Sequence, residues 1–185
     1  MTPWTLPQTA EIGGTVYKIN TDYRDILEIM RYLNDADTQE LLRWRIAVAL
    51  FYEGDVPLEH LQEAMNYLAE FISYGEKDDK RPAPKLLDWD QDAQAIIADV
   101  NKVSGAEIRN LEYLHWWSFL SYFYAIGEGQ LSTLVSIRDK LARGKKLEAW
   151  EQEYYRKNQS KIDFKNRYTQ AEEDTLERFR KMLEG

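Results

Sequence analysis

The chain has 185 residues, a formal net charge of −8 and no cysteine. This length suits one domain that buries roughly 70% of the surface of its unfolded chain. The lack of cysteine excludes disulfides, thiolate nucleophiles and zinc sites built on Cys, and the acidic balance disfavours nucleic acid as a partner. No apolar run approaches the ~20 residues of a membrane span and the first residues do not resemble a signal peptide, so we expect a soluble intracellular protein without a membrane partner.

Residues 10–19 predict a small N-terminal β-hairpin. The pair Gly13-Gly14 suits a two-residue turn in which both residues have positive φ. Pairing Ile12 with Thr15 places four apolar side chains on one face: Ala10, Ile12, Tyr17 and Ile19. A lone hairpin is marginally stable in water, so we expect this face to pack on the rest of the chain.

Apolar residues at helical spacing predict helices in most of the remaining chain. Thr21 is a candidate N-cap for the first helix. Asp37 and Glu40 resemble a capping box that opens a helix through Phe51, and this helix is apolar over most of its surface. We therefore expect the helix ending near Phe51 to lie at the centre of the fold.

The later helices follow the same periodicity. A coiled-coil-like seam at 58–72 precedes a loop at 75–87 that contains two prolines, and Asp88 is a candidate cap for the helix after it. An aromatic helix is expected at 108–126 and a shorter helix at 131–141. The predicted fold is mainly α, a multi-helix bundle of about seven or eight helices with the small N-terminal β-hairpin.

Charge and apolar content change near residue 145. Residues 1–145 are predicted to form the helical domain that carries the hairpin. From 146 to 185 the apolar residues thin out among many charges, which indicates a charged helical C-terminal arm, either solvated or ordered on a partner.

The aromatic helix is the strongest candidate for function. Seven of the twelve residues from 113 to 124 are aromatic, too many for one core-facing stripe. Trp116, Leu120 and Phe123 share a face that is expected to be core, whereas other aromatic residues point elsewhere. Because Trp and Tyr are enriched at binding hot spots, we predict a partner-binding set on this helix and on the C-terminal arm. Its members are Trp117, Tyr122, Tyr124, Trp150, Tyr154 and Tyr155.

Catalytic and metal chemistry find little support. Glu112-x-x-His115 has the spacing of half a di-iron carboxylate site, but His60, the only other histidine, has no acidic residue three positions before it. Ser118 and Ser121 lie on the predicted helix rather than on the strand-to-helix elbow that exposes a nucleophile. We therefore expect no enzyme, no metal and no cofactor.

A basic and aromatic stretch on the arm, which includes Arg156, Lys157 and Lys161, is compatible with phosphate contacts and base stacking. Glu153 and Asp163 interrupt this stretch, which favours a solvated charged helix instead.

Three stretches in order along the chain resemble the bacteriophage gene-product-fifteen family of tailed phages and prophages of Gram-positive bacteria. They are Gly13 to Asp25, Leu87 to Ala93, and Leu114 to Leu120, the last followed by Ile137-Arg138. The middle helices and residues 103–107 depart from the pattern.

The resemblance implies a tail assembly chaperone that keeps the long, helical tape measure protein soluble while tail tube subunits assemble around it. Other tail assembly proteins are further implied partners, and oligomerisation would multiply weak contacts. Such a protein acts in the cytoplasm of the bacterial host and is not expected in the mature virion. The alternative is a structural or regulatory phage interaction protein without chaperone activity.

Overall fold

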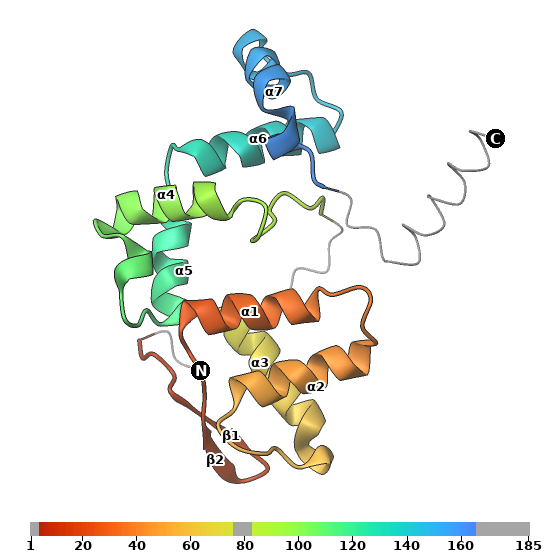
Figure 1. The fold of residues 1–185 in the computed structure, drawn as a ribbon, viewed down its shortest axis with the longest axis vertical. Coiled ribbons are helices and arrows are strands. Elements are labelled where there is room, and N and C mark those ends of the chain that lie inside the picture. Colours follow the sequence, from red (N-terminus) through yellow and green to blue (C-terminus); the bar gives the residue numbers. More distant parts are fainter. Residues whose placement is uncertain (1–3, 76–82, 166–185) are drawn as a thin grey trace, which may run out of the picture.

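A computed structural model describes residues 4–75 and 83–165, and this part of the chain is mainly α-helical (Figure 1). It contains seven α-helices, two 3-10 turns and one antiparallel hairpin, which confirms the predicted fold class. No helix in these residues is long and apolar enough to cross a membrane. The elements are β1 (Thr9–Ile12), β2 (Thr15–Lys18), α1 (Tyr23–Leu33), α2 (Glu40–Phe51), η1 (Leu58–His60), α3 (Leu61–Ile72), α4 (Ala93–Ser104), η2 (Ile108–Asn110), α5 (Trp116–Tyr124), α6 (Gln130–Ala142) and α7 (Ala149–Ile162).

The hairpin has the predicted register. Ile12 pairs with Thr15, and the turn residues Gly13 and Gly14 have φ values of 57° and 76°. Gly13 is needed for a second reason, since a Cβ there would collide with the ring of His60. Ala10 and Ile12 are buried, so the apolar face of the hairpin packs on the core as expected.

The helices form two halves joined by α5. The hairpin and α1 to α3 make one half, whereas α4, α6 and α7 make the other (Figure 1). Helix α5 packs against both α1 and α4. The ring of Tyr23 on α1 stacks on Phe119 of α5, with 5.0 Å between centroids, and Trp116 makes an edge contact with Trp89 beside α4.

The aromatic helix is shorter than predicted. Residues 108–110 form the 3-10 turn η2, and α5 begins only at Trp116. The backbone N–H of Trp116 donates to Thr21 O at 2.7 Å, and the N–H of Tyr23 donates to Leu114 O at 2.9 Å. These bonds pair the chain before α5 with the chain before α1 as an isolated antiparallel bridge, so residues 111–115 do not join the helix.

The helix caps also differ from prediction. Asp22, not Thr21, caps α1, because its carboxylate accepts the backbone N–H of Arg24 at 3.0 Å. Asp92 rather than Asp88 is the cap residue of α4, while Asp88 accepts two backbone N–H groups in the turn before it. The predicted box at the start of α2 is absent, since its cap residue, Gln39, makes no side-chain cap bond.

Helix α2 lies at the edge of its half rather than at the centre. Ala47, Val48 and Phe51 are buried against α1 and α3. Leu42, on the opposite side, is 50% exposed, and Leu41, in the first turn, is 62% exposed. The prediction of a central helix is wrong because a continuous apolar surface also arises when one face meets the core and the other meets water.

Arg138 of α6 organises the second half. Its guanidinium binds the carboxylate of Asp92 through two hydrogen bonds of 2.6 and 2.9 Å. Its other N–H groups donate to the carbonyl oxygens of Leu86, Lys161 and Ile162. All five guanidinium donors are thereby used, and the last two acceptors are carbonyls at the C-terminal end of α7.

The described part of the C-terminal arm packs on the domain through this network. Leu147, which precedes α7, and Ile162, its last residue, are buried. Glu151 is 1% exposed and binds Lys140 of α6 at 2.7 Å. The hydrogen bond from Lys140 and one from the Glu148 backbone outweigh desolvation and lower the pKa of Glu151. The proposed division at residue 145 stays a prediction, and residues 166–185 of the arm lie outside the described part.

We predict that Asp92→Asn lowers the free energy of unfolding by about 3–5 kcal/mol, because it leaves the buried Arg138 guanidinium without its counter-charge. The control is Glu153→Gln, which breaks an exposed ion pair with Lys157 and should cost less than about 0.5 kcal/mol. Denaturant unfolding measures both. Equal effects of the two substitutions would contradict the central role of Arg138.

Candidate partner-binding surfaces

The tryptophan pair at the start of α5 is part of the core. Trp117 is 3% exposed, and its ring packs against Phe71 of α3 with 5.7 Å between centroids. Its indole N–H donates to Phe71 O at 2.9 Å, and the indole N–H of Trp116 donates to Ile72 O at 3.0 Å. Both acceptors are carbonyls of the last turn of α3, so the two indoles complete the end of that helix. The prediction that Trp117 faces a partner is therefore corrected.

His115 begins α5 as its N-cap. Its Nδ1 accepts the backbone N–H of Trp117 at 3.0 Å, so the ring proton lies on Nε2 and is donated to Pro7 O at 3.0 Å. Burial lowers the pKa of His115 below its usual 6.5, although the Pro7 bond acts in the opposite direction. Both ring nitrogens are thus engaged in holding the chain before β1 to the start of α5.

Glu112 does not join His115 in a metal site. The Glu112 carbonyl instead accepts a hydrogen bond from Arg24 at 2.8 Å. Across residues 4–75 and 83–165, no three His, Cys, Asp or Glu side chains lie together in a way that suits a metal ion.

The two tyrosines of the predicted set on α5 differ in exposure. Tyr124 is 59% exposed, and its ring lies near those of Phe123 and Tyr74. Tyr122 is half-buried and packs on the core. Of this pair, Tyr124 is thus the more exposed residue, and its role in partner binding stays a prediction.

The predicted residues on α7 also differ in exposure. Trp150 is 56% exposed, whereas Tyr154 and Tyr155 pack partly on the core. The hydroxyl of Tyr155 donates to Asp163 at 3.0 Å, which raises the pKa of Tyr155. Helices α4 and α6 separate α7 from α5, so the predicted residues do not form one continuous patch (Figure 1).

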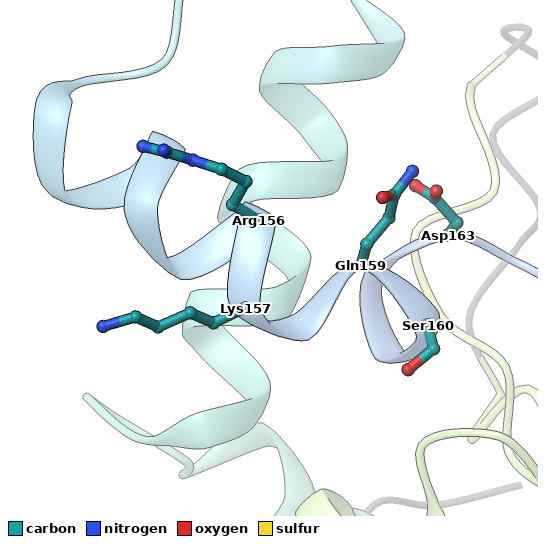
Figure 2. Close-up of a pocket in the computed structure, with 5 residues that line it drawn as sticks. All are labelled: Arg156, Lys157, Gln159, Ser160 and Asp163. Carbon is teal, nitrogen blue, oxygen red and sulfur yellow. The ribbon is translucent and has the colours of Figure 1, made fainter.

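A hollow of about 460 Å³ lies near the end of α7, where Asn158 departs from helical geometry (Figure 2). Arg156 and Lys157 extend to one side, whereas Gln159 and Asp163 lie on the other. The two cations do not converge on one point with the remaining groups, so the hollow has no arrangement suited to holding a phosphate.

A longer groove, here called the α1 groove, runs between α1 and residues 85–90. It consists of two hollows of about 470 and 340 Å³ that share Leu27, Arg31 and Asp90. Its apolar lining is half-buried and comes from both walls: Leu27, Met30, Leu87 and Trp89. Charged side chains border it, with Arg24, Glu28 and Arg31 on α1 and Lys85, Asp88 and Asp90 opposite.

Sequence reasoning missed one further apolar surface, the outer face of α2. This face comprises Leu41, Leu42, Arg45, Ala49 and Leu50, all exposed. The apolar residues there were assigned to the core because the whole helix is apolar. Arg45, a charged residue among the apolar ones, was the available signal that this side meets water.

The stretches that carried the family resemblance meet in pairs. The first and third join at the bridge between Asp22 and His115, and Asp22 also accepts the backbone N–H of Leu114 at 3.0 Å. The second stretch supplies Asp92, which binds Arg138. The motifs therefore supply residues to two polar junctions of the fold.

These features define a mainly α-helical protein whose core contains buried hydrogen bonds and whose surface carries exposed apolar faces. A family model described as Bacteriophage Gp15 protein matches residues 4–164, and the chain belongs to this family. No curated protein and no solved structure matches the chain.

Trp117→Phe is expected to lower the free energy of unfolding by about 1–3 kcal/mol, because the buried Phe71 carbonyl loses its donor while the ring is largely retained. Trp150→Phe, the same change at an exposed residue, should shift it by no more than about 0.5 kcal/mol. Thermal or denaturant unfolding compares them. A larger loss for Trp150→Phe would show that the roles of the two residues have been misassigned.

Stability should also depend on the protonation of His115. Its folded pKa lies below the unfolded value, so the stabilisation is complete above about pH 6.5 and is lost as the pH falls through the folded pKa. Asn retains a cap acceptor without titrating, so His115→Asn should show a smaller loss of unfolding free energy between pH 7 and 5 than the wild type. Identical pH profiles would contradict a neutral His115 cap.

Proposed function

We propose that this protein is a tail assembly chaperone that binds the tape measure protein and keeps it soluble during assembly. Membership of the Bacteriophage Gp15 family supports a role in a phage. The observation that carries the proposal is the outer face of α2, which exposes Leu41 and Leu42 on a helix whose other face is fully used by the core.

This face has the properties that a transient holdase needs. Exposed leucines bind the apolar stripe of an amphipathic helix, and nearby charges keep the complex soluble and reversible. Trp150 on α7 and Tyr124 on α5 add exposed aromatic contacts at separate places. Several weak contacts spread over a surface suit a long helical partner better than one deep pocket does.

In this account the protein acts in the host cytoplasm, leaves before the virion is complete, and works as a binding protein rather than an enzyme. Other tail assembly proteins and further copies of the chain are additional proposed partners.

Co-expression with the tape measure protein of the same phage tests the proposal. The wild type should raise the soluble fraction of the tape measure several-fold, and Leu41→Glu with Leu42→Glu should abolish the gain by placing charge on the contact face. The matched control is Val16→Glu with Leu58→Glu, two exposed apolar residues away from α2 that are 66% and 72% exposed. This control should behave as wild type.

Two results would count against the proposal, and they differ in meaning. If the wild type does not raise the soluble fraction of the tape measure, the protein is not its chaperone. If the variant Leu41→Glu with Leu42→Glu raises the soluble fraction of the tape measure as much as the wild type does, the outer face of α2 is not the binding surface. Finding the protein in purified virions would favour the structural alternative.

A further inference from the structure

The α1 groove is an apolar surface that the proposed function does not use. Leu27 and Met30 of α1 face Leu87 and Trp89 of the opposite wall across the larger hollow of about 470 Å³. Half-buried apolar side chains in an open groove are the usual setting for an amphipathic segment that docks between two walls. The question is which segment covers it.

The described chain ends beside this groove. The backbone N–H of Lys165 donates to the side chain of Gln91 at 3.0 Å, and Gln91 directly follows Asp90 of the groove wall. The ring of Phe164 lies 5.0 Å from the ammonium nitrogen of Lys85, another groove residue. The chain after α7 thus returns to the segment that precedes α4 (Figure 1).

The sequence that follows has a matching pattern. Residues 166–185 lie outside the described part, but Leu176, Phe179 and Leu183 are spaced by three and four positions, as on one face of a helix. The segment carries acidic residues at 172–174 and basic residues at 178, 180 and 181. The groove is bordered by charges of both signs, so each set has groups of opposite sign within the rim.

The segment after Lys165 is long enough to reach along the α1 groove. Leu176 lies eleven positions after Lys165, a distance along the chain of about 16 Å even as a helix and more when extended. The α1 wall from Arg24 to Asn34 is about 15 Å long by the same rise per residue. The apolar positions can therefore lie along the groove without any movement of α7.

We propose that residues 166–185 bind in the α1 groove of the same molecule through Leu176, Phe179 and Leu183. The C-terminal segment covers Leu27, Met30, Leu87 and Trp89, and a partner helix that enters this groove must displace it. This inference is independent of the chaperone function, because it concerns contacts within one chain.

Because the 185-residue chain contains no cysteine, pairs of introduced cysteines measure the contact directly. Arg31→Cys with Met182→Cys should form an intramolecular cross-link with a short bis-maleimide. The control places the α1 cysteine at Asp25, which is exposed and does not line the groove, and should cross-link at least several-fold less. Equal cross-linking in the two variants, no cross-link in either, or cross-links only between molecules would overturn the proposal.

Two single changes test the apolar contact. Phe179→Gln added to the Arg31→Cys, Met182→Cys protein should reduce the cross-link several-fold, whereas Glu177→Gln, on the charged side of the same pattern, should not. An equal effect of both changes would refute docking through Phe179.

Hydrogen exchange gives a second readout. The variant Phe179→Gln with Leu183→Gln should exchange faster at residues 27–31 and 87–90 than the wild type, while α3 and α6 stay unchanged. No increase at the groove, or the same increase throughout the protein, would overturn the proposal.

Discussion

A short backbone pairing, between residues 21–23 and 114–116, holds the two halves of the protein together. The N–H of Trp116 donates to Thr21 O, the N–H of Tyr23 donates to Leu114 O, and Asp22 accepts the N–H of Leu114. Burial opposes ionisation of Asp22, but its bonds from Arg24 and from the backbone of Arg24 and Leu114 outweigh this and lower its pKa. Helices α1 and α5 both begin at this pairing, so their crossing and the stacking of Tyr23 on Phe119 depend on it.

That pairing also fixes where the aromatic residues at the start of α5 lie. Once the chain is fixed before Trp116, the next two indoles reach the last carbonyls of α3, and His115 caps the helix while binding Pro7. The segment that looked most like a binding surface is therefore the internal joint of the fold. The proposed function therefore places partner contact on residues that the core does not use, on the outer face of α2 and at Trp150 and Tyr124.

Local patterns predicted those features that depend on neighbours in sequence. The Gly13-Gly14 turn, its register and most helices followed from turn chemistry and periodicity. The start of α5 did not, because its first backbone partners come from Thr21, more than ninety residues earlier. The exposed face of α2 and the burial of Trp117 were also missed, since apolar character alone does not tell which side of a helix meets the core. Arg138 appeared only as part of a resemblance, because its five acceptor atoms come from two segments outside its own helix, residues 86–92 and 161–162.

Hydroxyl-radical footprinting of the free protein and of its complex with the tape measure protein tests the central claim most directly. The account predicts that Trp116 and Trp117 are protected in both samples, while Leu41, Leu42 and Trp150 are modified in the free protein and protected in the complex. Strong modification of Trp117 in the free protein that the partner then suppresses would contradict it, since the aromatic joint would then be the binding surface.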